Sequence, residues 1–149
     1  MKAQVVYATI TGNNEEVADI VVDALRGKNV EVTKSEISQT ELTAFEKADI
    51  CVVCAYTYDE GALPEEGLDF FDDLKEADLA GKVYGVAGSG DVFYGDDFNK
   101  AVDEFDGAFA QSGATKGAEN VKIDLEPYEE DVETLQQFSD ALVKASTQG

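Results

Sequence analysis

Runs of apolar residues alternate along this chain with longer stretches in which apolar positions recur at the period of a helix. The runs predict five β-strands, at Gln4 to Ala8, Val30 to Ser35, Ile50 to Tyr56, Val83 to Ala87 and Val121 to Leu125. Helices are predicted between and after them, at 15–26, 65–77, 98–111 and 128–145, with a shorter candidate at 40–47. Strands interleaved with helices predict an α/β fold, a three-layer sandwich in which helices cover both faces of a five-stranded parallel sheet.

The polarity of each strand predicts its place in the sheet. The strands at 4–8 and 50–56 are almost continuously apolar, as strands covered on both faces should be. The strand at 30–35 is more polar and alternating, which indicates an edge. With an edge second strand, right-handed crossovers predict the order 2-1-3-4-5. Ligands of such sheets bind at the carboxyl ends of strands one and three, where the winding direction reverses.

The length, charge and apolar content of the chain exclude several kinds of protein. The chain has 149 residues, is 44% hydrophobic and contains no linker-like segment, so we expect one domain over residues 1–149. Its formal net charge of −21 argues against nucleic-acid binding. The charge could serve solubility alone or steer encounters with basic partner surfaces. The absence of a signal-like or membrane-length apolar segment predicts a cytoplasmic protein, and the absence of an evident exposed apolar helix face makes a monomer the default.

Two cysteines form a C-x-x-C sequence inside a predicted strand. Residues three apart in a strand face opposite sides and lie about 10 Å apart, so Cys51 and Cys54 are expected to be core thiols rather than a disulfide. The chain contains no His, the usual general base and metal ligand, and no metal site is predicted.

The segment after the first strand is a candidate phosphate-binding loop. Thr9-Ile10-Thr11-Gly12-Asn13-Asn14 directly precedes the first predicted helix, whose first turn presents unpaired N–H groups and the positive end of the helix dipole. No Lys or Arg occurs between Lys2 and Arg26, which excludes a Walker-type loop. Taken alone, the segment could also be an ordinary helix cap.

Two further loops are predicted at the same edge of the sheet. Thr57 to Pro64 follows the third strand, and Gly88 to Tyr94 follows the fourth. Each carries an aromatic ring, Tyr58 in one and Tyr94 in the other. Two rings on separate loops could hold a flat conjugated ligand between them while its phosphate reaches the first loop.

These three motifs resemble those of short-chain flavodoxins, and the resemblance covers essentially the whole chain. Flavodoxin loops have the forms T-x-T-G-N-T, T-W-G-D-G-E-L-P and G-x-G-D-x-x-Y, which residues 9–14, 57–64 and 88–94 match in order. Flavodoxins are themselves a standard example of the 2-1-3-4-5 order, so the topology and the resemblance are not independent predictions. The resemblance implies a low-potential one-electron carrier that binds FMN, shuttles electrons between oxidoreductases, and turns over no substrate. The negative charge adds the expectation that these partner proteins have basic surfaces.

The resemblance also implies which residues bind the cofactor. The first loop would hold the phosphate, the aromatic rings would lie on either side of the isoalloxazine, and the second and third loops would contact N5 and the pyrimidine edge. The residues concerned are Thr9, Ile10, Thr11, Gly12, Asn13, Asn14, Thr57, Tyr58, Asp59, Glu60, Gly61, Ser89, Gly90, Asp91 and Tyr94.

Several positions depart from the family pattern. Asn14 replaces the last hydroxyl residue of the phosphate loop, and Tyr58 replaces the common Trp. Asp59 stands at the turn beside N5, where Gly is frequent and where a positive φ can be required. The segment after Tyr94 is one residue longer than the commonest spacing, which leaves Phe93 as the alternative outer ring.

Three other functions are compatible with parts of the pattern. One is a flavodoxin-like activator dedicated to a single metalloenzyme, and another is a flavin-dependent quinone reductase, which would need a nicotinamide pocket. A receiver-type regulatory module shares the sheet order but needs an Asp directly after strand three. Here Asp59 comes only beyond the aromatic Tyr56-Thr57-Tyr58 segment, which argues against that module.

Overall fold

The computed structural model describes residues 1–8, 13–56, 68–90, 100–124 and 128–148. Its strands are β1 (Lys2–Tyr7), β2 (Glu31–Glu36), β3 (Ile50–Tyr56), β4 (Val83–Gly90), β5 (Thr115–Lys116) and β6 (Val121–Asp124). Its helices are α1 (Asn13–Arg26), α2 (Thr43–Glu46), α3 (Leu68–Glu76), α4 (Lys100–Gln111) and α5 (Glu129–Gln148), with a short 3-10 helix η1 (Ile37–Gln39).

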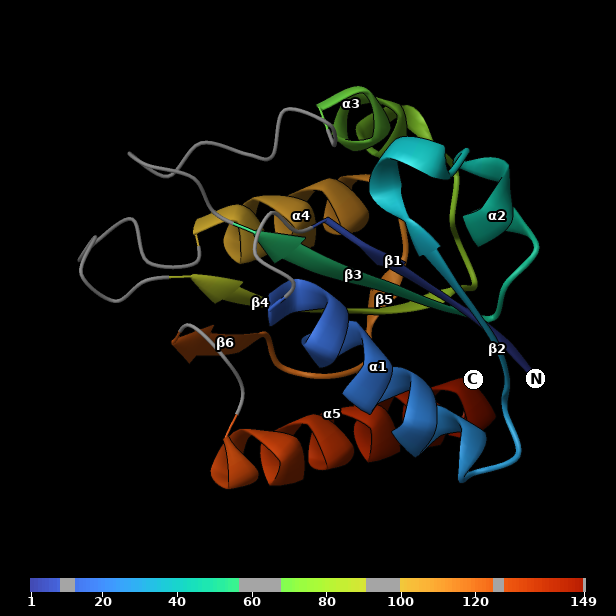
Figure 1. The fold of residues 1–149 in the computed structure, drawn as a ribbon. Helices are drawn as coiled ribbons and strands as arrows, with labels where there is room; N and C mark the ends of the chain where they lie inside the picture. The colour runs from blue at the N-terminus through green and yellow to red at the C-terminus, as the bar shows by residue number, and fades with distance from the viewer. Residues whose placement is uncertain (9–12, 57–67, 91–99, 125–127, 149) are drawn as a thin grey trace.

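The described strands form one parallel sheet in the order β2-β1-β3-β4-β5, with β6 also paired to β4. This confirms the predicted 2-1-3-4-5 order, with β5 and β6 together in the fifth place. The arrowheads of β3, β4 and β6 point to the same side of Figure 1, so their carboxyl ends share one edge. Strand β2 is the outermost strand on one side of the sheet, and β5 lies on the other side. The polar, alternating sequence of β2 predicts this outer position.

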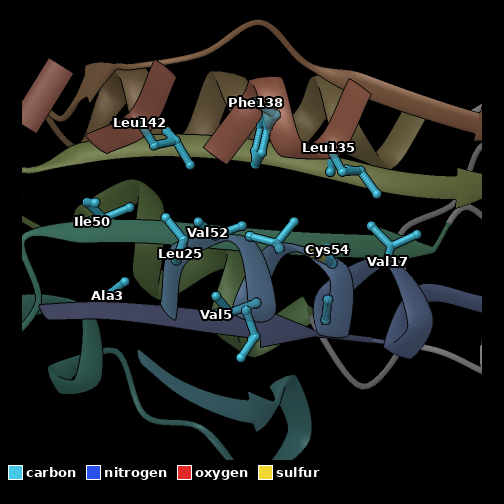
Figure 2. Packing of buried hydrophobic residues seen from close by; sticks show 14 of the residues in the cluster. Ala3, Val5, Val17, Leu25, Ile50, Val52, Cys54, Leu135, Phe138 and Leu142 are labelled. Atoms are coloured by element: carbon cyan, nitrogen blue, oxygen red, sulfur yellow. The ribbon is translucent and has the colours of Figure 1, made fainter. Parts of the chain in front are cut away.

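Helices cover the two faces of the sheet in separate groups (Figure 1). One core cluster joins the sheet to α1 and α5, through side chains such as Val17, Leu25, Leu135 and Leu142. Figure 2 shows the labelled side chains of α1 and α5 beside those of β1 and β3 in this cluster. The helix α5 also approaches β4 closely, since a Cβ at Gly85 would lie 2.6 Å from the Phe138 ring.

The second core cluster joins the other face of the sheet to α2, α3 and α4. Phe45 of α2 is fully buried, and its ring lies 5.4 Å from that of Phe70 and 5.5 Å from that of Phe109, centroid to centroid. Tyr84 of β4 stacks on Phe109 at 4.6 Å. The four-residue helix α2 is therefore anchored by one large side chain.

The two cysteines occupy opposite faces of β3, as predicted. Cys51 belongs to the α2-side cluster and Cys54 to the α1-side cluster, and both thiols are free and buried. Burial raises the pKa of each thiol to about 12.

We expect neither thiol to react with Ellman's reagent in the native protein at pH 8, because the reactive thiolate is almost absent and shielded from solvent. In denaturant both should react, which gives an internal control for the reagent. Rapid titration of either thiol in the native protein would contradict their placement in the core.

Some element boundaries agree with the predictions and others differ. Strand β3 and the end of α1 are as predicted, whereas α5 runs to Gln148 rather than 145. The helix predicted at 40–47 is wrong in extent, because only Thr43–Glu46 are α-helical. Thr40 is extended and its hydroxyl donates to the carbonyl of Glu36, so this residue ends η1 instead of beginning a helix.

The fifth strand was predicted as one segment, but two short segments pair with β4. Strand β5 pairs with Val83 and Tyr84, and β6 pairs with residues 87–90. A Cβ at Gly117 would lie 2.4 Å from a Val83 methyl carbon, so the segment between β5 and β6 passes close to β4.

Candidate functional site

The carboxyl ends of four strands come together at one edge of the sheet. Tyr7 of β1 pairs with Cys54 of β3, and the N–H of Ala8 donates to the carbonyl of Cys54 at 3.0 Å. Farther along, Tyr56 pairs with Ser89 and Gly90 with Asp124. Segments that follow β1, β3 and β4 therefore start from neighbouring points, as the sequence predicts.

Helix α1 begins at this same edge. Its first residue is Asn13, only five positions after Ala8, and the helix runs for 14 residues. The first four N–H groups of a helix have no acceptor within it, and the helix dipole adds positive potential at that end. The start of α1 is therefore suited to an anion, and it contains no Lys or Arg.

The predicted site residues divide into two groups. Four lie in described elements: Asn13 and Asn14 open α1, and Ser89 and Gly90 end β4. The others lie outside the described residues, namely Thr9, Ile10, Thr11, Gly12, Thr57, Tyr58, Asp59, Glu60, Gly61, Asp91 and Tyr94. Their roles stay predictions.

One part of the third predicted loop is strand. Residues 88–90 were expected to leave the sheet after Ala87, but β4 continues to Gly90. Glycine disfavours strands, yet this segment pairs on one side with β3 and on the other with β6. Hydrogen bonding from both neighbours outweighs the local propensity. Ser89 and Gly90 thus belong to the sheet edge itself.

A charged cluster that the sequence analysis missed lies beside the start of α1. The hydroxyl of Tyr7, at the end of β1, donates to Glu15 Oε2 at 3.2 Å. Lys34 Nζ, from β2, lies 3.1 Å from the same oxygen and 2.6 Å from Asp19 Oδ1. The hydrogen bond to Asp19, and then that to Glu15, raises the pKa of Lys34, so its ammonium stays charged.

A second polar cluster connects α4 to the segment between β5 and β6. Asp106 of α4 accepts hydrogen bonds from the Tyr84 hydroxyl, Lys116 Nζ at 2.9 Å and Asn120 Nδ2 at 3.0 Å. Partial burial alone would raise the pKa of Asp106, but these hydrogen bonds lower it overall. Lys122 Nζ adds an ion pair of 2.7 Å to Asp103. These contacts attach α4, the helix that follows the third predicted loop, to the sheet.

A polar groove of about 530 Å³ lies elsewhere, between β1, β2, η1 and α2. Its lining includes Lys2, Ala3 and Gln4, at the amino end of β1. None of its lining residues is a predicted site residue, so this groove is not the predicted site.

Comparison with known proteins decides the family. The family model described as Flavodoxin matches residues 5–138. The chain belongs to the flavodoxin family. A probable flavodoxin of Bacillus subtilis (strain 168) is 34% identical over 139 residues, which are 93% of this chain and 87% of that protein.

Solved structures agree with this membership. A short-chain flavodoxin associated with a bacterial microcompartment is 69% identical, with a TM-score of 0.97 over 98% of this chain and 99% of that one. The flavodoxin of Streptococcus pneumoniae TIGR4 is 49% identical, with a TM-score of 0.94 over 97% and 99%. This flavodoxin is an electron carrier with FMN as its cofactor, and it works with redox partner proteins.

The described residues fit FMN at the carboxyl edge of the sheet. A phosphate needs donors, and the start of α1 supplies backbone N–H groups; of the two acids in its first turn, Glu15 is paired with Lys34 and Tyr7, and Glu16 is exposed to solvent. The ends of β1, β3 and β4, after which the three motifs follow in the sequence, are neighbours in the sheet. Among the described helices, none is long and apolar enough to cross a membrane.

Proposed function

We propose that this flavodoxin is a low-potential one-electron carrier that acts as a cytoplasmic monomer, forms one FMN-binding domain over residues 1–149 and turns over no substrate of its own. The observation that carries the proposal is the convergence of the ends of β1, β3 and β4 with the start of α1. Parallel sheets of this order bind their ligands at that point. Bound FMN supplies the redox centre, which takes up and releases electrons singly.

The phosphate is assigned to the segment between β1 and α1. Hydroxyl groups of Thr9 and Thr11, amides of Asn13 and Asn14, and backbone N–H groups of Ile10, Gly12 and the first turn of α1 would donate to it. All these donors are neutral, so binding depends on their number and orientation rather than on a salt bridge.

The flavin ring is assigned to the second and third motifs. Tyr58 and Tyr94 would lie on its two faces, and stacking of this kind favours flat conjugated ligands. Ser89, Gly90 and Asp91 would contact the pyrimidine edge, and Thr57, Asp59, Glu60 and Gly61 would form the turn at N5. A backbone carbonyl of that turn would accept a hydrogen bond from the flavin N5 when that atom carries a proton.

Acidic residues in these motifs favour a low potential. A carboxylate about 10 Å from the flavin, at an effective dielectric constant of ~20, opposes an added negative charge by roughly 1.7 kcal/mol before screening. Asp59, Glu60 and Asp91 belong to the proposed flavin-binding motifs and would act in this way, and the net charge of −21 has the same sign. The same charge would steer the protein toward partners with basic surfaces, in a salt-dependent way.

FMN titration of the apoprotein tests this function. We expect stoichiometric binding with quenching of flavin fluorescence, and no steady NADPH oxidation by the holoprotein without a partner. Sustained NADPH oxidation by the purified protein alone would instead support the quinone reductase. A single partner recovered in pull-down would support an activator dedicated to one metalloenzyme.

Replacing Asp59 with Gly should raise the midpoint potential for the first electron. If the N5 turn requires positive φ, Asp costs about 1 kcal/mol more than Gly, which corresponds to roughly 40 mV for a one-electron step. Spectroelectrochemical titration of the wild type and D59G measures this difference directly. An equal or lower potential in D59G would contradict the assigned turn conformation.

A further inference from the structure

The ammonium group of a lysine from β2 lies beside the start of α1. Lys34 comes from β2, and its ammonium lies 3.1 Å from Glu15 Oε2 and 2.6 Å from Asp19 Oδ1, two carboxylates one turn apart on α1. It also lies 5.3 Å from the centroid of the Tyr7 ring, at the end of β1. The cluster thus joins the three elements β1, β2 and α1 at the carboxyl edge of the sheet.

The first half of α1 would otherwise carry only negative side-chain charge. Glu15, Glu16, Asp19 and Asp23 are its ionisable residues before Arg26, which lies in the last turn. Glu15 is the third residue of the helix, so its backbone is about 3 Å along the axis from that of Asn13. A dianionic phosphate at this end would lie close to Glu15 and Glu16, with Asp19 one turn farther along the helix.

We propose that Lys34 is a positioning and specificity residue for the phosphate of FMN, acting through Glu15 and Asp19 rather than by contact. This inference rests on the proposed placement of the phosphate at the start of α1. Lys34 offsets one of the two negative charges on Glu15 and Asp19 and, with Tyr7, holds Glu15 on the β2 side of the helix. The neutral donors of the loop can then bind a doubly charged group, and FMN is favoured over riboflavin.

The test is a titration of the apoprotein with FMN and, separately, with riboflavin, which lacks the phosphate. In Lys34→Gln the dissociation constant for FMN should rise about fivefold at low ionic strength, because two carboxylates lose their counter-charge near the dianion. The effect should shrink in 1 M salt, where the screening length is only ~3 Å. The dissociation constant for riboflavin should be unchanged.

Lys28→Gln is the matched control. Lys28 follows the last turn of α1 and forms an ion pair of 2.7 Å with Asp140, so this variant loses the same charge and a similar surface pair. Its position is about 20 Å along the helix from Asn13, and its FMN affinity should equal that of the wild type. Removing the two acids as well, in K34Q/E15Q/D19N, should restore most of the affinity for FMN.

Three outcomes would overturn the inference. The first is wild-type FMN affinity in K34Q at low salt, and the second is an equal loss of FMN and riboflavin affinity, which would indicate a purely structural role. The third is failure of K34Q/E15Q/D19N to bind FMN better than K34Q. If the wild-type apoprotein bound riboflavin and FMN equally, or neither, the proposed phosphate site itself would be wrong.

Discussion

Replacing Asn14 with Asp should weaken FMN binding by ~100-fold or more while leaving the apoprotein at least as stable as the wild type. Asn14 is the second residue of α1, at the proposed phosphate site. The substitution keeps the shape of the side chain, removes an N–H₂ donor and adds a negative charge close to a dianion. The same charge interacts favourably with the helix dipole, by about 0.3–1 kcal/mol, so stability and affinity should change in opposite directions.

Asn29→Asp provides the control for this prediction. Asn29 lies just beyond the other end of α1 and has φ 65°, a conformation that Asp tolerates nearly as well as Asn. The same change of amide to carboxylate there should leave FMN affinity unchanged. Isothermal titration with FMN and riboflavin, and thermal melting of each apoprotein, give the required numbers. Wild-type FMN affinity in N14D would place the phosphate elsewhere.

Replacing Phe45 with Ala should reduce the free energy of unfolding by about 3–5 kcal/mol. Phe45 is fully buried, and its ring contacts Phe70 of α3 and Phe109 of α4. It is also the buried residue of a four-residue helix, so little else attaches α2 to the core. The cavity would open under one face of the sheet, where the surrounding aromatic rings can collapse only in part.

Urea denaturation of the apoprotein measures this loss as a lower midpoint at an unchanged m-value. Tyr128→Ala is the control, because Tyr128 is an aromatic residue with 64% of its surface exposed. Its removal should change stability by less than ~0.5 kcal/mol. A comparably small effect of F45A would contradict the packing of α2 against α3 and α4.

The central strands could be predicted because burial on both faces leaves an unambiguous apolar run. Ile50–Tyr56 was predicted to the residue, and the edge position of β2 followed from its polar alternation. The extent of β4 was missed, because residues 88–90 have weak strand propensity and are held by partners distant in sequence. Strand β5 is only two exposed residues long, which leaves no periodic signal to detect.

Motif order and strand order together predict a site where β1, β3 and β4 end. The sheet register confirms that these strand ends are neighbours, and the site itself stays a proposal. The charge compensation beside α1 could not be predicted. The pairing of Lys34 with Glu15 and Asp19 joins residues 15 to 19 positions apart through the β1–β2 register. From sequence, Lys34 is one polar position of an edge strand, and only the fold shows which helix it faces.

Anaerobic photoreduction of the FMN-loaded protein, followed by visible absorption, tests the electron-carrier account most directly. A carrier that handles electrons singly should show a long-wavelength band that rises and then decays as reduction proceeds. Passage straight from the oxidised to the fully reduced spectrum, with no such band, would contradict the account.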